Sequence, residues 1–266
     1  MSQPSTITRV TLRRVAGAPS LLLAEVGDGR WTGLAAAPDR PGLAEAAGRW
    51  GAGWIGRSAD HGPGPGPIGG DWLRDNADWT AFGLLESARH DLAARRHDVP
   101  LWRWLGGAVR RAVGVSGSTD ERPTGAGGPR VTDPSRWSEL EGDLLADRVD
   151  GLRVDPLRAG GPAGVLRLDA IARTFRVGLA LVSGATLAGR ALAVHLAMAA
   201  TMATLPLDWP DDDPPDQAWL GPARAYRSDG GRVTAPEAAG LGLAIEAARL
   251  APLVTERWSV GEDDRG

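Results

Sequence analysis

Apolar segments of strand length alternate with helical patterns in the second half of the chain, and this alternation restricts the fold more than any other feature. Residues 151–155 and 177–183 are predicted strands, and the second is a continuous apolar run, as in strands covered on both faces. A helical pattern follows each of them, over 165–175 and 187–202. A shorter candidate strand at 205–209 contains Pro206. This order is typical of a parallel sheet or a barrel segment.

The first hundred residues carry a different pattern. Three apolar runs, the last two separated by Gly27-Asp28-Gly29, predict short antiparallel strands, because Asp-Gly pairs favour hairpin turns. Helical patterns follow at 41–55 and 76–96, and the second places Arg89, Arg95 and Arg96 on the face opposite its apolar stripe. The segments 61–70 and 119–131 are rich in Gly and Pro and are predicted loops. A strand is predicted at 112–116 and a helix after Asp133.

Composition excludes several kinds of chemistry. The 266 residues include 30 basic side chains, all of them Arg, and no Cys, so neither a lysine amine nor a thiolate is present. Residues with AT-rich codons are scarce, so a GC-rich genome also explains the missing Lys. A net charge of −3 argues against nucleic acid as a partner. The segment 191–207 is too short and too rich in Ala to span a membrane, and the first residues lack a signal-peptide core, which predicts a cytoplasmic protein.

Three stretches resemble one known family. Residues 100–107 read Pro-Leu-Trp-Arg-Trp-Leu-Gly-Gly, residues 155–161 read Asp-Pro-Leu-Arg-Ala-Gly-Gly, and residues 229–236 read Asp-Gly-Gly-Arg-Val-Thr-Ala-Pro before Gly-Leu-Gly-Leu at 240–243. In this order they resemble the enolase superfamily, in its mandelate racemase and muconate lactonising branch. The resemblance implies an α/β fold with an amino-terminal α+β capping domain, residues 1–105, on a (β/α) TIM-type barrel, residues 106–266.

The length implies that this barrel is incomplete. A complete (β/α) barrel takes about 250 residues, and the capping domain leaves only about 160. Only 32 residues separate the first-strand candidate, ending at Ser118, from the sixth-strand candidate at Gly151. We therefore predict a partial, truncated barrel that lacks its middle strands.

The missing strands are those that bear the chemistry implied by the resemblance. Members of this branch hold Mg²⁺ with carboxylates on strands three to five and use Lys from strand two to abstract a proton next to a carboxylate. Neither set is recognised here, so we predict no metal site and no cofactor. Asp155 corresponds to the position of an acid/base group on strand six, whereas the histidine of the mandelate type corresponds to about Val182.

Asp155 is thus the candidate catalytic residue, since it ends a predicted strand at the catalytic face of barrel enzymes. The candidate substrate-binding residues are Arg153, Arg158, Ser116, Ser118 and Ser183. Alternation places Arg153 on the same side as Asp155, so an Arg–Asp ion pair is the competing interpretation. The serines are equally explained as turn formers.

Other polar and aromatic groups have structural interpretations. His195 lies among Ala and Leu and is predicted to pack in the core, and the spacing of His90 and His97 does not suit a metal. The acidic run 208–216 is predicted to be a solvated loop. Tryptophans 72, 79, 102 and 104 are predicted to fill a domain junction rather than line a ligand site.

Two principal hypotheses follow. The first is a catalytically degenerate relative that acts as a scaffold, an assembly subunit or a small-molecule binder, with a homo-oligomer or a protein partner covering the open barrel edges. The second is a metal-independent isomerase or lyase in which Asp155 is the acid/base and Arg153 or Arg158 holds a small carboxylate ligand. A third hypothesis is a smaller α/β sheet with an unrelated site.

Overall fold

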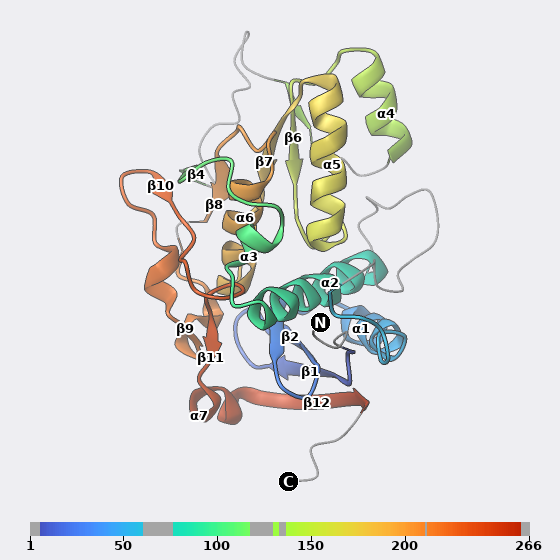
Figure 1. Cartoon of the computed structure of the whole chain (residues 1–266), viewed down its shortest axis with the longest axis vertical. Coiled ribbons are helices and arrows are strands. Elements are labelled where there is room, and N and C mark those ends of the chain that lie inside the picture. Colours follow the sequence, from blue (N-terminus) through green and yellow to red (C-terminus); the bar gives the residue numbers. More distant parts are fainter. Residues whose placement is uncertain (1–5, 61–76, 118–129, 133–136, 211, 262–266) are drawn as a thin grey trace.

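The amino-terminal part of the chain is an antiparallel sheet covered by two helices on one face (Figure 1). A computed structural model describes residues 6–60, 77–117, 130–132, 137–210 and 212–261. The sheet has the order β12-β1-β2-β3. Its strands are β1 (Arg9–Val15), β2 (Leu21–Gly27), β3 (Thr32–Pro38) and β12 (Val254–Gly261). The Asp28 carboxylate accepts hydrogen bonds from the amides of Arg30 and Trp31, which confirms the predicted turn between β2 and β3.

Helices α1 (Leu43–Ala52) and α2 (Ala77–Arg96) pack on this sheet because alternate strand residues are apolar. The backbone of α2 lies directly on β3: a Cβ built on Gly33 would come within 2.1 Å of the Ala88 carbonyl oxygen. Both helices were predicted from the spacing of apolar residues. The prediction that Arg89 faces away from the apolar stripe was wrong. Its side chain is buried and pairs with Glu86 one turn earlier on α2.

Asp91 of α2 connects three parts of the chain. Its fully buried carboxylate accepts hydrogen bonds from the amide of Leu34 on β3 (2.8 Å) and from the amide of Leu241 (2.6 Å). Arg95 completes the arrangement with a 2.8 Å ion pair to Asp91. At Gly240, φ is +66°, and a Cβ there would come within 2.1 Å of the carboxylate. The glycines at 240–242 therefore form a turn that allows close contact with α2.

The second part of the chain alternates parallel strands with helices. In chain order its elements are α3 (Leu101–Trp104), β4 (Val113–Gly117), β5 (Val131–Thr132), α4 (Trp137–Leu145), β6 (Gly151–Val154), α5 (Gly161–Phe175), β7 (Gly178–Leu181), α6 (Leu187–Ala199) and β8 (Leu207–Trp209). Strands β5, β6 and β7 are parallel neighbours, and so are β8 and β4. A parallel bridge between Val182 and Asp208 joins the two sets.

The resulting strand order, β5-β6-β7-β8-β4, places the first strand beside the last, as at the closure of a barrel. The fold is thus a mixed α/β fold, as predicted. In the described part of the chain these parallel strands form an open sheet rather than a closed barrel. Only 13 residues, 118–130, separate β4 from β5. The absence of middle barrel strands remains a prediction.

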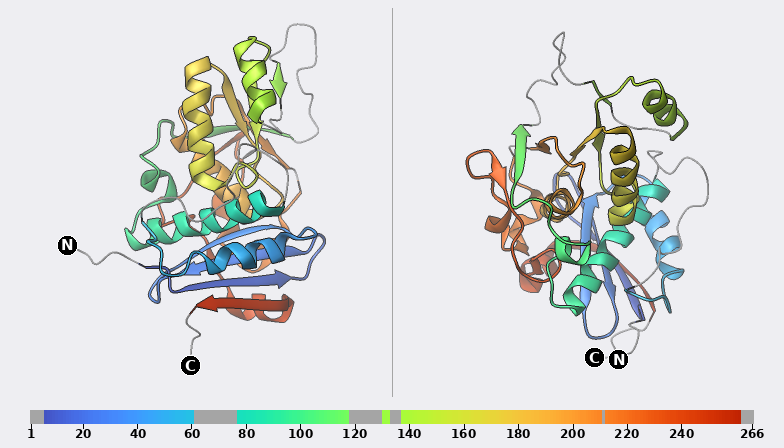
Figure 2. Two further views of the ribbon diagram at one scale, coloured as in Figure 1. Left: turned by 90° about the vertical axis from the view of Figure 1, so that its right-hand side faces the viewer. Right: turned by 45° about the horizontal axis from the view of Figure 1, so that its top comes forward.

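The last segment returns to the amino-terminal sheet. It contains short elements: η1 (Pro215–Ala218), β9 (Leu220–Gly221), η2 (Ala223–Tyr226), β10 (Arg232–Val233), β11 (Ala244–Ile245), α7 (Ala247–Leu250) and η3 (Ala251–Leu253). β12 then pairs with β1 along its whole length. Figure 2 shows this strand at the rim of the sheet. The sequence patterns did not predict β12. The division into two domains at residue 105 remains a prediction. β12 belongs to the segment 106–266, but it pairs with β1 of the amino-terminal sheet.

The helices that the structure describes include none that is both long and apolar enough to cross a membrane.

Backbone contact between α2 and the loop after β6 generates a stability prediction. A Cβ at Gly83 would lie 2.0 Å from the carbonyl oxygen of Leu157, which cannot move without shifting that loop. Gly83→Ala should therefore lower the free energy of unfolding by about 2–3 kcal/mol. The matched control is Gly48→Ala in α1, where the new methyl group meets nothing within 4 Å and should stabilise the helix by about 0.5–1 kcal/mol. Urea unfolding measures both, and equal effects would contradict the close contact.

Candidate functional site

Polar side chains gather at the carboxyl ends of the parallel strands, where the sequence predicted a site. Arg153 of β6 forms an ion pair with Asp208 of β8 across the intervening strand β7. On β7 the residue opposite Arg153 is Ala180, whose small side chain leaves room for this contact. The Arg153 side chain is 38% exposed and that of Asp208 is 18% exposed, so the pair faces a partly solvated side of the sheet.

Asp155 does not pair with Arg153, so the competing interpretation of an Arg153–Asp155 ion pair was wrong. Its Oδ1 instead accepts hydrogen bonds from the amides of Leu157 (2.9 Å) and Arg158 (3.4 Å). This pattern is an Asx turn, in which a carboxylate fixes the backbone of the residues that follow it. Asp155 therefore shapes the loop between β6 and α5, and Arg158 enters that turn through its backbone.

Two of the three candidate serines lie in the described residues. Ser183, which follows β7, is fully buried, and its Oγ has no hydrogen-bond partner in the described part of the chain. Its amide donates to the Asp208 carbonyl oxygen (3.1 Å), so Ser183 and the Arg153–Asp208 pair are close neighbours. Ser116 of β4 donates to the Leu207 carbonyl oxygen (3.3 Å). Ser118 lies outside the described residues.

Asp208 is the residue that sequence reasoning missed, because the whole run 208–216 was assigned to a solvated acidic loop. That prediction was wrong at both ends of the run. Asp216 is fully buried, and its carboxylate accepts hydrogen bonds from the amides of Leu187 (2.5 Å) and Ala188 (3.2 Å) at the start of α6. Burial raises the pKa of Asp216, and these two hydrogen bonds act in the opposite direction. Alternation with Leu207 and Trp209 was the available signal for Asp208.

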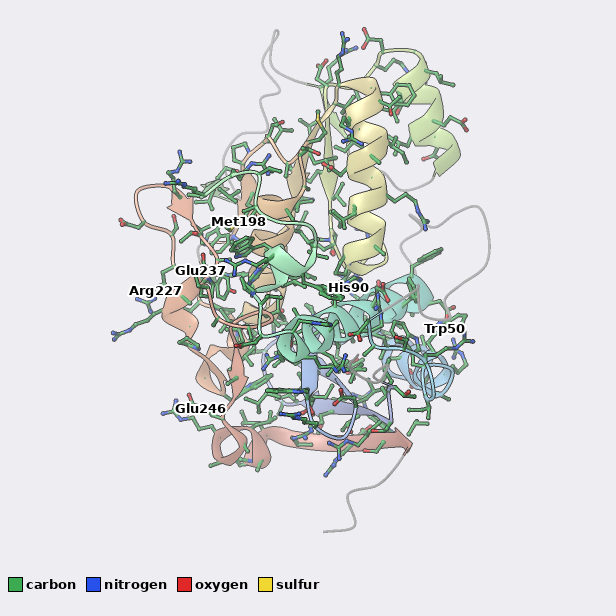
Figure 3. All side chains as sticks on the ribbon, viewed as in Figure 1. Trp50, His90, Met198, Arg227, Glu237 and Glu246 are labelled. Atoms are coloured by element: carbon green, nitrogen blue, oxygen red, sulfur yellow. The ribbon has the colours of Figure 1, made fainter. Side chains whose placement is uncertain are left out.

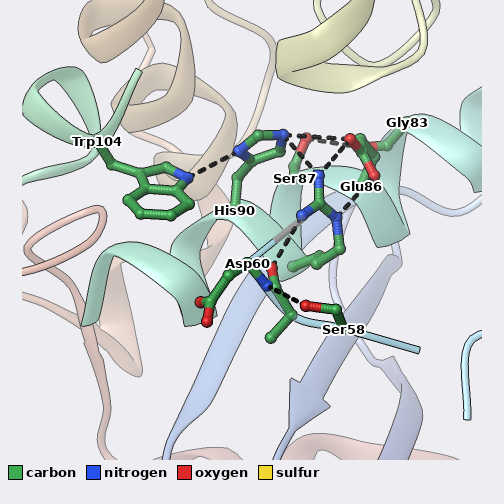
Figure 4. A network of polar contacts seen from close by, with 9 residues as sticks. Ser58, Asp60, Gly83, Glu86, Ser87, His90 and Trp104 are labelled. Atoms are coloured by element: carbon green, nitrogen blue, oxygen red, sulfur yellow. Dashed lines mark hydrogen bonds and ion pairs between the residues drawn. The ribbon is translucent and has the colours of Figure 1, made fainter. Parts of the chain in front are cut away.

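A second buried polar network lies on α2, and Figure 3 labels one of its members, His90. The carboxylate of Glu86 accepts from Arg89 through both oxygens, at 2.7 and 3.0 Å. Trp104 donates its indole N–H to His90 Nδ1 (3.1 Å), so the ring proton lies on Nε2 and is donated to Glu86 (3.1 Å; Figure 4). Arg89 also donates to the Ala59 carbonyl oxygen.

Electrostatics keep this network ionised at Glu86. Burial alone would raise the pKa of Glu86, but the hydrogen bonds from His90 and Arg89 outweigh it and lower the pKa to about 2. Burial lowers the pKa of His90, so its ring stays neutral. A Cβ at Gly161 would lie 3.0 Å from Glu86 Cβ, which places the network against the loop that Asp155 shapes. The network therefore joins the two parts of the chain.

His195 is fully buried in α6, as the sequence predicted. The Trp102 amide donates to its Nδ1 (3.1 Å), and its Nε2 donates to the hydroxyl of Tyr226 (2.8 Å). Burial lowers the pKa of His195 to about 3. The imidazole is therefore a neutral structural link between α3, α6 and the last segment. Of the four tryptophans assigned to a junction, Trp72 lies outside the described residues, whereas Trp102 and Trp104 contact α6 and α2 through these bonds.

The described residues do not fit the Mg²⁺ site implied by the resemblance. Their acidic and histidine side chains include no group of three or more that could hold a metal ion. At the carboxyl ends of the strands, Asp208 is paired with Arg153 and Asp155 is bound to backbone amides. Mg²⁺ prefers carboxylate ligands in near-octahedral geometry, and a guanidinium beside the carboxylate opposes that arrangement.

The fold and this site define a class of α/β proteins. In this class, polar side chains lie at the carboxyl ends of parallel strands, and an antiparallel sheet with its helices packs beside them. Residues 134–249 match the family model described as enolase C-terminal domain-like. No curated protein sequence matches the chain. The family-model match covers less than half of the chain, so it identifies residues 134–249 as enolase C-terminal domain-like, and the solved structures extend the likeness as a shared fold.

Solved structures agree over the length of the chain. An enolase protein from the environmental genome of the Sargasso Sea superposes with a TM-score of 0.78 at 17% identity, over 98% of this chain and 100% of the other. A mandelate racemase/muconate lactonizing family protein from Azoarcus sp. EbN1 gives a TM-score of 0.74 at 14% identity, over 96% and 100%. An L-talarate dehydratase from Polaromonas sp. JS666, in complex with Mg and L-glucarate, gives 0.72 at 16%, over 97% and 99%.

The buried imidazole generates a prediction on pH dependence. The pKa of His195 is about 3 in the folded chain, against about 6.5 when unfolded, so the unfolded chain binds the proton more tightly. Its contribution to stability is complete above about pH 6.5 and is lost as the pH falls toward 3. Between pH 7 and pH 4.5, protonation of His195 in the unfolded chain should lower the parent's free energy of unfolding. In His195→Gln this decrease should be smaller by about 2 kcal/mol. Urea titrations at both pH values measure this.

The matched control is His97→Gln, because the His97 side chain is 49% exposed. This variant should lose stability between pH 7 and 4.5 as the parent does. A His195→Gln variant with the parent's pH dependence would show that His195 is not the buried neutral group.

Proposed function

We propose that this chain is a catalytically degenerate member of the superfamily that binds a small carboxylate at the carboxyl ends of β6, β7 and β8. The observation that carries the proposal is the engagement of the candidate acid/base: the Asp155 carboxylate holds the turn into α5 through two backbone amides. Both bonds go to Oδ1, and because they hold the carboxylate in the turn they favour a structural role for Asp155. The chain also has no Lys to replace it.

Ligand binding is supported by Arg153 and Ser183. Arg153 has five N–H donors, and its side chain is 38% exposed beside its ion pair with Asp208. Ser183 has a buried hydroxyl for which the described residues supply no partner, and an unmade buried hydrogen bond costs about 1–3 kcal/mol. A ligand carboxylate that reaches either group would accept a hydrogen bond from it, and the charge-assisted bond from Arg153 would be among the stronger ones.

The alternative function is a metal-independent isomerase or lyase that uses Asp155 as its acid/base. Its support is the position of Asp155, half-buried and directly after β6 at the face where barrel enzymes hold their catalytic groups. The structurally similar proteins include an L-talarate dehydratase, and this activity belongs to that protein. Localisation in the cytoplasm also remains a prediction.

Binding and proton exchange separate the two functions. We expect the purified chain to bind L-glucarate, the ligand in the L-talarate dehydratase structure, or tartrate, the ligand in a similar enolase structure from Mycobacterium smegmatis, in calorimetry. Arg153→Met should weaken this binding at least tenfold, because the charge-assisted hydrogen bonds are lost. The control is Arg167→Met, an exposed residue of α5 that should leave binding unchanged.

The second measurement is NMR of each bound acid in D₂O, which detects exchange of the proton next to the carboxylate. The degenerate binder should show no exchange. Exchange that disappears in Asp155→Asn would overturn the proposal in favour of the isomerase or lyase. Equal affinity in the parent and in Arg153→Met would contradict the location of the ligand site.

A further inference from the structure

The outer edge of β12 is an unpaired strand edge. β12 runs for eight residues, Val254–Gly261, and is the last strand in the sheet order β12-β1-β2-β3. No strand in the described part of the chain pairs with its outer side, and Figures 1 and 2 show it at the rim of the molecule. Residues 255–259 are exposed, and Trp258 is an exposed large hydrophobic side chain at 38%.

Natural proteins protect exposed edges with Pro, charged side chains (Lys above all), β-bulges or very short strands, because bare backbone N–H and C=O groups attract another strand. β12 has no Pro and no Lys, and its charged side chains are Glu256 and Arg257. The register of the β1–β12 pair shifts between Arg14 and Val15, near the Val254 end of β12. From Glu256 to Gly261 the pairing is regular. We propose that a second copy of this chain pairs its own β12 with this edge, antiparallel, so that the two sheets become continuous.

Symmetry restricts the register of this contact. In such a dimer, a two-fold axis relates the two antiparallel copies of β12. This axis is perpendicular to the sheet, so each face of one copy continues as the same face of the other. Side chains alternate between faces, so one residue must lie opposite its own copy on the axis. Within Val254–Gly261, the longest overlaps are 254–260, centred on Arg257, and 255–261, centred on Trp258.

Charge decides between these two registers. The first sets Arg257 opposite Arg257, and like charges directly opposed destabilise a strand pair. The second sets Trp258 opposite Trp258, which buries two exposed rings and forms an aromatic cross-strand pair. It also sets Arg257 opposite Ser259 and Glu256 opposite Val260, with no like charges opposed. The dimer is therefore centred on Trp258.

Sedimentation of the full chain tests the dimer. The parent should have twice the chain mass of 27.8 kDa at micromolar concentration. Trp258→Glu places two carboxylates opposite each other on the axis and should sediment at the mass of one chain. Circular dichroism and thermal unfolding of this variant report whether it folds. A parent that sediments as one chain, or a folded Trp258→Glu variant that stays a dimer, would overturn the proposal.

Disulfide trapping tests the register and does not depend on the stability of Trp258→Glu. The chain has no Cys, so each introduced thiol is unique. Directly opposed strand residues have Cα atoms about 4.5–5.5 Å apart, within the range of a disulfide. Under a mild oxidant, Trp258→Cys should form a covalent dimer, whereas Glu256→Cys alone should not. Mixing Glu256→Cys with Val260→Cys should form a covalent heterodimer.

Crosslinking of Arg257→Cys with itself, and not of Trp258→Cys, would show the other register and contradict the assignment. No crosslinking in any of these variants would show that this edge does not pair. The inference concerns the amino-terminal sheet and is independent of the proposed ligand site, so carboxylate binding and dimer formation can fail separately.

Discussion

The buried carboxylate of Asp91 is the interaction on which the arrangement of the two parts depends. It holds the amide of Leu34 in the amino-terminal sheet and the amide of Leu241 in the last segment, while Arg95 balances its charge. Because an unpaired buried charge costs several kcal/mol, all three contacts must form together. Helix α2 therefore has one position against the sheet and one against the turn at Gly240. Its backbone contact with the loop after β6 follows from this placement.

This arrangement explains why the polar residues of α2 are structural. Glu86, Arg89 and His90 would be unusual in a buried helix, yet each finds its partner within the network, and the network lies against Gly161. The same principle applies at the carboxyl ends of the strands, where Arg153 and Asp208 pair and Asp155 holds a turn. At both places, charged groups of this chain contribute to its packing. The proposed ligand contacts are the Arg153 guanidinium and the Ser183 hydroxyl.

Much of the fold was predictable because periodicity reports burial. The three amino-terminal strands, α2, β6, β7 and α6 lie close to their predicted positions, and His195 is in the core as expected. The site was less predictable. Whether a charge is solvated depends on partners that are distant in the sequence. The acidic run was therefore assigned to a solvated loop, although Asp208 pairs with Arg153 and Asp216 accepts from the Leu187 amide. Strand β12 was missed because its exposed residues carry no apolar alternation.

Local pattern alone was enough to establish the order of strands and helices, the turn at Asp28 and the absence of lysine and thiol chemistry, since these depend on neighbouring residues or on residue type. Only the folded chain decided that Arg153 meets Asp208 rather than Asp155, that Arg89 is buried, and that β12 closes one side of the first sheet and leaves its own edge unpaired. The Arg153–Asp208 pair joins residues 55 positions apart and a hydrogen bond between β1 and β12 joins residues 248 apart, while Arg89 reaches the Ala59 carbonyl oxygen 30 positions away. Such contacts form only when packing brings the segments together, and no period in the sequence encodes them.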